Sequence, residues 1–286
     1  MLSRVRRDDA FHAPRLSEVQ LRIVESMRRD GIATASFHEL YPQEVWEELR
    51  EDIGSFARET ETRLDEYRQR TGGKTYIVRR FVARNPGAAE PKKVKFAPSD
   101  RWLRVGLSSP ILDVVNSYRG ELTYLIDIDN WYTIPDLNAE ERVESQRWHR
   151  DPWDNHIVKV FVYFSDVDEE AGPFEYVRGS PQGGRYGELW AWVPKGIYPP
   201  QKELEAAVDP VDRLMVTGPA GTIIFCDTSG FHRGGAAKTK PRILSYHTYV
   251  RPSTEKSARF RVRWRDDGEG LSPQARFALA WSLDRT

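Results

Sequence analysis

A run of alternating side chains between residues 157 and 167 constrains the fold more than any other stretch. Val158, Val160 and Val162 alternate there with Lys159 and Phe161. Because successive side chains of a β-strand point to opposite faces, the alternation predicts a sheet strand with one strongly apolar face. Further strand patterns occupy residues 31–37, 76–82, 122–134, 174–177, 214–216, 222–227 and 243–250. The sequence therefore predicts a mainly β protein.

Helical patterns flank these strands. Ser17 and Gln20 form a capping box at the start of an amphipathic stretch that ends before Gly31. Other helices are predicted at 42–70, 109–118, 201–208 and from 272 onward. The length of 286 residues suits one large domain. We therefore expect a flexible tail over residues 1–15, followed by a single domain over 16–286. Its predicted fold is a double-stranded β-helix, a jelly-roll and cupin-like core with helices packed on one outer sheet.

Composition excludes several classes of function. Basic and acidic residues balance at 43 each, so no net charge attracts the chain to nucleic acid or to a membrane surface. No apolar run approaches the roughly 18 residues that a transmembrane helix needs. The single cysteine, Cys226, cannot form an internal disulfide, which fits a reducing cytosol. We expect a cytoplasmic monomer or homodimer that acts on a small molecule.

The candidate site begins at the segment QRWHRDPW, residues 146–153. His149 and Asp151 are two residues apart on a predicted strand, so their side chains leave the same face. Together with the distant His232 they make a ligand set of two imidazoles and one carboxylate, a facial triad typical of non-haem Fe(II). His156 is an alternative third ligand. Catalytic zinc also takes three protein ligands and an open position, so a zinc-dependent cupin-like hydrolase or isomerase without O2 chemistry is the alternative function.

The order His149-x-Asp151, His232 and then Arg242, within GFHRGGAAKTKPR, resembles the phytanoyl-CoA dioxygenase family of Fe(II)- and 2-oxoglutarate-dependent oxygenases. The resemblance covers roughly residues 20 to 250. It implies Fe(II) as cofactor, held by the triad, with 2-oxoglutarate and O2 as co-substrates that give succinate and CO2. It also implies hydroxylation of a small organic molecule, or its desaturation or cyclisation. A natural-product or other secondary-metabolite intermediate would suit the mixed aromatic and polar residues after position 178. The turn at residues 178–181 departs from the Pro-Gly-Ser-His of the family.

Other residues are assigned roles around this core. A guanidinium binds a carboxylate bidentately, so Arg242 is the expected anchor for 2-oxoglutarate. Tyr246 shares its strand face and could add a hydrogen bond, whereas Gln146 could do so only if the chain bends before His149.

Four aromatic residues are candidate substrate contacts, with packing in the core or rim as the alternative: Trp148, Trp153, Trp190 and Tyr132. Two segments, 85–99 and 182–200, are candidate lids because both are long and irregular.

Overall fold

The computed structural model describes residues 11–71, 76–81, 93–137, 142–152, 154–191, 198–254, 257–264 and 270–284. The helices are α1 (Glu18–Asp30), α2 (Gln43–Thr62), α3 (Leu64–Thr71), α4 (Arg101–Gly106), α5 (Ser109–Arg119), α6 (Gln201–Ala207) and α7 (Pro273–Leu279). The strands are β1 (Ile32–Ser36), β2 (Ile77–Arg79), β3 (Val94–Phe96), β4 (Tyr124–Thr133), β5 (Ile157–Tyr163), β6 (Phe174–Val177), β7 (Arg213–Val216), β8 (Thr222–Asp227), β9 (His232–Gly234), β10 (Arg242–Val250) and β11 (Phe260–Val262).

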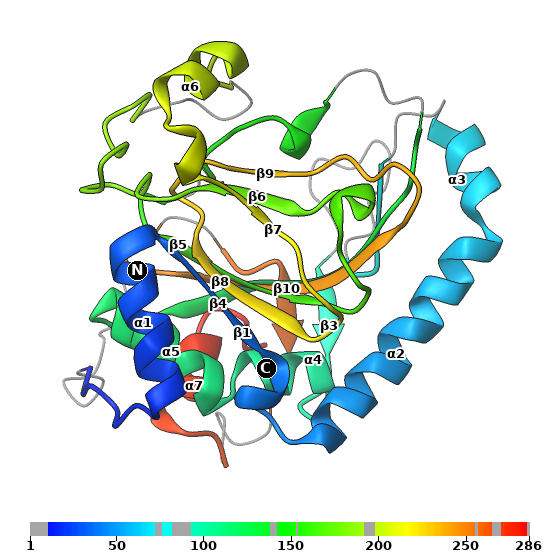
Figure 1. The fold of residues 1–286 in the computed structure, drawn as a ribbon. Helices are drawn as coiled ribbons and strands as arrows, with labels where there is room; N and C mark the ends of the chain where they lie inside the picture. The colour runs from blue at the N-terminus through cyan, green and yellow to red at the C-terminus, as the bar shows by residue number, and fades with distance from the viewer. Residues whose placement is uncertain are drawn as a thin grey trace.

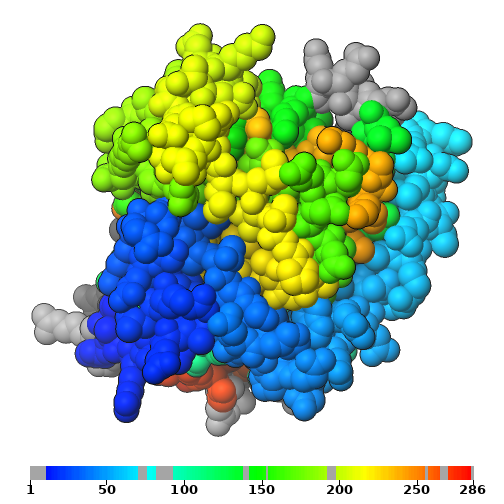
Figure 2. All heavy atoms as spheres, in the orientation of Figure 1, coloured from blue at the N-terminus to red at the C-terminus, as the bar shows by residue number. Residues whose placement is uncertain are grey.

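Two antiparallel sheets form the core of the molecule. The larger has the strand order β1-β8-β5-β10-β4-β2, and the smaller has the order β7-β6-β9. Figure 1 shows the smaller sheet lying across one face of the larger, with α1, α5, α7 and α4 on the opposite face. In the space-filling view the N-terminal helices, in blue, make up the lower part of the molecule (Figure 2). The predicted mainly β core with helices on one outer sheet is confirmed.

The central strand β5 shows why both faces of the large sheet are covered. Val158, Val160 and Val162 belong to the apolar cluster that includes residues of α1, α2 and α5. Phe161 and Tyr163 belong to a second cluster, shared with Phe174 and Tyr176 of the smaller sheet. The alternation therefore separates a helix-facing side from a side that faces the space between the sheets. Lys159 lies on the second side.

Several predicted boundaries differ from the structure. The helix expected over 42–70 breaks at Arg63, which leaves the α-helical conformation, so that α2 and α3 are separate. Within the candidate lid 85–99, residues 94–96 form β3, which pairs in parallel with β11. Residues 85–92 lie outside the described part of the chain. Within the predicted tail, Phe11 packs against the cluster that contains Tyr124 and Phe277.

Arg259, Arg261, Arg263 and Arg265 alternate with apolar residues, a pattern that predicts an edge strand with a charged, solvated outer face. Instead, Arg259 Nη1 donates to Asp127 Oδ2 at 2.9 Å, and Asp127 is buried. This arginine is therefore part of an internal charge network, which sequence alternation alone does not reveal. Among the described residues, no helix has the length and apolarity needed to cross a membrane.

His247 of β10 gives the fold a testable dependence on pH. It faces the helices, where its Nε2 hydrogen-bonds the carbonyl of Trp102 at 2.8 Å, and a Cβ at Gly106 would lie 2.5 Å from its ring. Burial lowers the pKa of His247 from 6.5 to about 4. Between these values the unfolded chain binds more protons than the folded protein, so stability is lost as pH falls.

We therefore expect His247→Gln to flatten the acid loss of stability. For wild type, His247 should contribute a loss of about 2 kcal/mol between pH 7 and pH 5, following from the shift in pKa. The measurement is urea unfolding of the metal-free wild type and variant at both pH values. Contributions from other histidines are common to both proteins and cancel. Equal pH slopes would show that His247 does not titrate in this way.

Candidate functional site

His149 and His232 are held opposite each other by the backbone rather than by a regular strand. His149 N donates to His232 O at 3.0 Å, and His232 N donates to His149 O at 2.9 Å. The expected strand around His149 is therefore only a single antiparallel bridge. A residue pair that exchanges both hydrogen bonds lies directly across the ladder, so the two side chains emerge together. Their ring centroids are 4.2 Å apart.

The three predicted ligands converge in space. Ligand atoms of His149, Asp151 and His232 all lie within 4.8 Å of one another, and this group could hold a metal ion. Each imidazole is oriented by its Nδ1, which lies 2.8 Å from Arg147 O in His149 and 3.0 Å from Gly230 O in His232. Because a carbonyl accepts, each Nδ1 carries the proton and each Nε2 lone pair faces the group. Coordination of a metal through Nε2 needs this tautomer.

Burial and charge set the protonation state of the group. Burial lowers the pKa of His232 from 6.5 to about 3, and it also lowers the pKa of His149. Burial by itself would raise the pKa of Asp151, but the ammonium of Lys159 and then the two imidazoles bring it below its usual range. At neutral pH the site therefore presents two neutral imidazoles and one carboxylate. A divalent metal binds histidine and aspartate side chains only in these protonation states.

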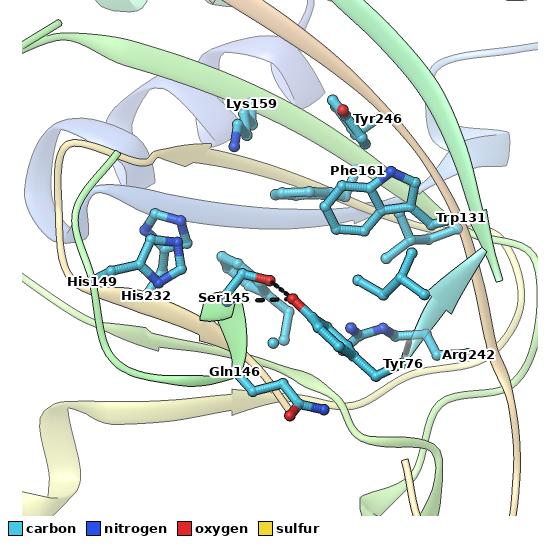
Figure 3. A pocket seen from close by; sticks show the side chains of 14 residues that line it. Tyr76, Trp131, Ser145, Gln146, His149, Lys159, Phe161, His232, Arg242 and Tyr246 are labelled. Atoms are coloured by element: carbon cyan, nitrogen blue, oxygen red, sulfur yellow. Dashed lines mark hydrogen bonds between the residues drawn. The ribbon is translucent and has the colours of Figure 1, made fainter. Parts of the chain in front are cut away.

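The triad opens into a pocket between the two sheets. The empty space at the pocket is about 530 Å³ with its open mouth included. It is lined by Tyr76, Ile77, Trp131, Ser145, Gln146, His149, Lys159, Phe161, Phe174, His232, Gly234, Arg242, Leu244 and Tyr246. Figure 3 shows the two histidines at one end of the pocket and Arg242 at the other, beside Tyr76.

Arg242 lies where the sequence predicts it, in the same pocket as the histidines. It is 3% exposed, and its Nη1 donates to the carbonyl of Gly172. Its Nε has no hydrogen-bond partner among the described residues. Burial lowers the pKa of Arg242, although a guanidinium stays charged at neutral pH. A buried cation with unused donors suits a carboxylate ligand.

Gln146 and Tyr246, the two other residues predicted to bind the co-substrate, both line the pocket but have different hydrogen-bond partners. Gln146 lines the pocket through the bend that the prediction required, a 3-10 turn over residues 144–146. Its Oε1 caps this turn by accepting from Val143 N, and in Figure 3 its amide turns away from the histidines. Tyr246 also lines the pocket, but its hydroxyl donates to Asp127 and accepts from Arg79. The Tyr246 hydroxyl proton is therefore engaged with Asp127 in this structure, and its hydrogen bond to 2-oxoglutarate stays a prediction.

Three of the four aromatic candidates for substrate contact, Trp148, Trp190 and Tyr132, do not line this pocket. Trp148 is 0% exposed, packs with Val177 and Phe231, and donates its Nε1 to Glu205. Trp190 packs against the same cluster. Tyr132 lies on the helix-facing side of β4, where its hydroxyl bonds Glu61 of α2. These three expectations are corrected to packing roles, and Trp153 lies outside the described residues.

Part of the second candidate lid approaches the triad. The ring centroid of Tyr198 is 6.1 Å from that of His149, and the guanidinium of Arg147 lies 3.7 Å above the Tyr198 ring. Residues 192–197 lie outside the described part of the chain. Arg150 ties the described part of this segment to the site, since its guanidinium donates to the carbonyls of residues 180, 186, 187, 189 and 229.

Sequence reasoning missed Tyr76, Ser145 and Lys159. Tyr76 and Ser145 share a hydroxyl hydrogen bond of 2.8 Å next to Arg242, although 69 residues separate them. No local pattern marks either one. Lys159 had a signal, since it interrupts the second apolar face of β5. The alternative ligand His156 is not part of the metal-ligand group and lies near Arg119 and Asp227.

No family model and no curated protein matches the sequence. The resemblance to the phytanoyl-CoA dioxygenase family therefore rests on the motif alone. Solved structures do match. The epimerase SnoN, in complex with Fe3+, alpha ketoglutarate and nogalamycin RO, is 16% identical, with 82% of this chain and 85% of that chain covered and a TM-score of 0.53.

EctD from S. alaskensis, with bound Fe, is also 16% identical over 91% of this chain and 87% of its own, with a TM-score of 0.52. AviO1 from Streptomyces viridochromogenes Tue57 is 16% identical over 85% and 99%, with a TM-score of 0.51. At such identities the likeness concerns the fold. It supports the predicted jelly-roll core.

Proposed function

We propose that the protein is an Fe(II)- and 2-oxoglutarate-dependent dioxygenase that oxidises a small organic molecule. The observation that carries this proposal is the placement of Arg242 in the pocket that the triad opens into. A metal-dependent hydrolase needs the metal ligands but has no need for a buried guanidinium with unused donors at the far end of the same cavity. The motif resemblance points in the same direction.

The residues present fit the metal. His149, Asp151 and His232 would hold it through two imidazole nitrogens and one carboxylate oxygen, the ligand set that non-haem Fe(II) enzymes use. The hydrogen bonds from Nδ1 to backbone carbonyls fix both rings before any metal arrives, which reduces the ordering cost of binding. The three remaining coordination positions would be available to co-substrate and O2.

The residues also fit the co-substrate. 2-Oxoglutarate carries two carboxylates, one next to the keto group and one at the far end. Arg242 would bind the far carboxylate, with Tyr76 and Ser145 next to it in the pocket wall. None of the described residues that line the pocket is acidic. The cavity therefore favours a dianion.

When bound, the iron and the 2-oxo acid together supply the activation of O2 and the removal of hydrogen from the substrate. The residues of this chain would bind and orient the iron and the co-substrate, and they would exclude water from the site. Phe161, Phe174 and Trp131 give the pocket apolar walls, which limit access of water to the site. Trp131 is fixed by its indole Nε1, which donates to Asp129 at 3.1 Å.

For the reaction outcome, we propose hydroxylation as the default, with desaturation or cyclisation of a natural-product intermediate also compatible with the site. Similar structures support a secondary-metabolite substrate, since SnoN is an alpha ketoglutarate dependent epimerase from nogalamycin biosynthesis. SnoK, from the same biosynthesis, is described as a carbocyclase. Screening of candidate substrates for succinate release would identify the substrate.

The proposal is tested by adding Fe(II) and 2-oxoglutarate anaerobically to the metal-free protein. We expect the charge-transfer absorption of a chelated 2-oxo acid, and on admission of O2 we expect succinate. Tight binding of zinc without any such absorption would favour the alternative, a zinc-dependent cupin-like hydrolase or isomerase.

Tyr76→Phe is expected to weaken 2-oxoglutarate binding by roughly fivefold, the effect of one lost neutral hydrogen bond. The hydroxyl of Tyr76 lies 2.8 Å from Ser145 Oγ, so the variant removes a polar group next to Arg242 without disturbing the triad. Titration of the charge-transfer absorption measures the co-substrate affinity, and calorimetry should show unchanged metal affinity. An unchanged co-substrate affinity would place Tyr76 outside the anion site.

A further inference from the structure

Lys159 is a buried lysine on a face of β5 that is otherwise apolar. The same face carries Phe161 and Tyr163, which pack into the cluster between the two sheets. The Lys159 side chain is 11% exposed, and its Nζ lies 2.7 Å from Asp151 Oδ2. Lysines are almost never buried this deeply unless they are paired. The partner in this case is the carboxylate of the candidate metal site.

The ammonium of Lys159 lies beside the candidate metal site. Its Nζ lies 5.8 Å from the centroid of the Tyr246 ring, which contributes only a weak attraction to a cation. Lys159 Nζ forms an ion pair with Asp151, whose Oδ2 also lies 3.8 Å from His232 Nε2. Figure 3 shows Lys159 projecting into the same cavity as both histidines. Any metal bound by Asp151 would share that carboxylate with the ammonium.

We propose that Lys159 is a positioning residue that holds Asp151 and sets the charge of the site, weakening the affinity for a divalent metal while strengthening the affinity for the doubly negative co-substrate. This inference rests on the proposed function. It concerns Asp151 Oδ2, the oxygen that lies near both the ammonium of Lys159 and Nε2 of His232.

The two effects follow from the signs of the charges. A divalent cation and the Lys159 ammonium repel each other, and they compete for the same carboxylate. Once the metal is bound, the site carries two charges from the metal, one from Lys159 and one from Arg242, against one negative charge from Asp151. The excess positive charge attracts a dianion. Because the region is buried, water screens these interactions little.

Lys159→Met removes the charge and keeps most of the length of the side chain. We expect Fe(II) to bind this variant about tenfold more tightly and 2-oxoglutarate to bind the metal-loaded variant about tenfold more weakly, since unit charges interact strongly at short range in a buried site. Anaerobic calorimetry measures the first affinity, and titration of the charge-transfer absorption measures the second. Lys159→Arg should restore both. Lys240→Met is the matched control, because Lys240 forms an exposed ion pair with Asp168.

A merely structural lysine would not shift the two affinities in opposite directions. Changes in the same direction, or no change in either affinity, would overturn the proposal. If loss of the ion pair prevents folding of Lys159→Met, Lys159→Gln replaces it, because the amide can still donate to Asp151 without a charge.

The proposed function can fail separately. If the wild type binds Fe(II) but shows no absorption with 2-oxoglutarate, the dioxygenase proposal fails. The metal titration then decides the role of Lys159 alone, with tighter binding in the variant supporting it and unchanged or weaker binding overturning it.

Discussion

Replacing His232 with alanine is expected to abolish oxidation and to lower Fe(II) affinity at least about 100-fold, since even residues that only orient metal ligands contribute 10–100-fold. His232 supplies one of the three ligand atoms that lie within 4.8 Å of one another. Its backbone hydrogen bonds with His149 do not depend on the side chain, so the bridge that positions His149 should persist. Anaerobic calorimetry with Fe(II) measures the loss.

His156→Ala is the matched control for this experiment. His156 lies two residues beyond Asp154 and outside the metal-ligand group, although the sequence allowed it as a third ligand. We expect its Fe(II) affinity to equal that of the wild type. The opposite pattern, with metal binding lost in His156→Ala and retained in His232→Ala, would overturn the assignment of the site.

Replacing Arg242 with methionine is expected to weaken 2-oxoglutarate binding about 100-fold, because losing one partner of a buried, hydrogen-bonded charge pair costs 2–5 kcal/mol. The side chain is 3% exposed, so water cannot easily substitute for the guanidinium. Metal affinity should change little, since Arg242 is at the opposite end of the pocket from the histidines (Figure 3). The charge-transfer absorption, titrated with 2-oxoglutarate, reports the effect.

Two comparisons distinguish a loss of 2-oxoglutarate binding by Arg242→Met from a loss of the fold. Arg185→Met is the control, because Arg185 forms an exposed ion pair with Asp212 and lies outside the pocket lining. Thermal unfolding of Arg242→Met tests whether loss of the bond to the Gly172 carbonyl disturbs the fold. A folded Arg242→Met variant that binds 2-oxoglutarate as well as the wild type would rule out Arg242 as the anchor.

The pairing of the candidate metal ligands His149 and Asp151 could be predicted from the sequence because their spacing carries the information. Two residues two apart share a face whether the backbone forms a full strand or a single bridge, so the missing strand around His149 did not affect the prediction for Asp151. Arg242 was predicted from the resemblance to the family pattern, which has an arginine about ten residues after the second histidine. Tyr76, Ser145 and Lys159, which lie around these residues, have no characteristic spacing in the sequence.

Substrate contacts could not be predicted because both faces of the large sheet are buried. Along β4, Tyr132 and Trp131 are equally plausible pocket residues from their composition. Tyr132 is buried among the helices, whereas Trp131 lines the pocket. Alternation shows that two neighbours face opposite ways, but it identifies the inner face only where the other face meets water. Trp148 was misassigned because being next to a ligand in sequence does not make a residue its neighbour in the pocket.

The sequence by itself determined most of the strands and the shared face of His149 and Asp151, because periodicity and short spacing are local properties of the backbone, and the resemblance to a family pattern added His232 and Arg242. Only the tertiary structure decided which residues complete the site. Tyr76 meets Ser145 across 69 residues, and Lys159 of β5 meets Asp151 at 2.7 Å. Such contacts depend on how two sheets are stacked, and no short-range pattern in the chain encodes that arrangement.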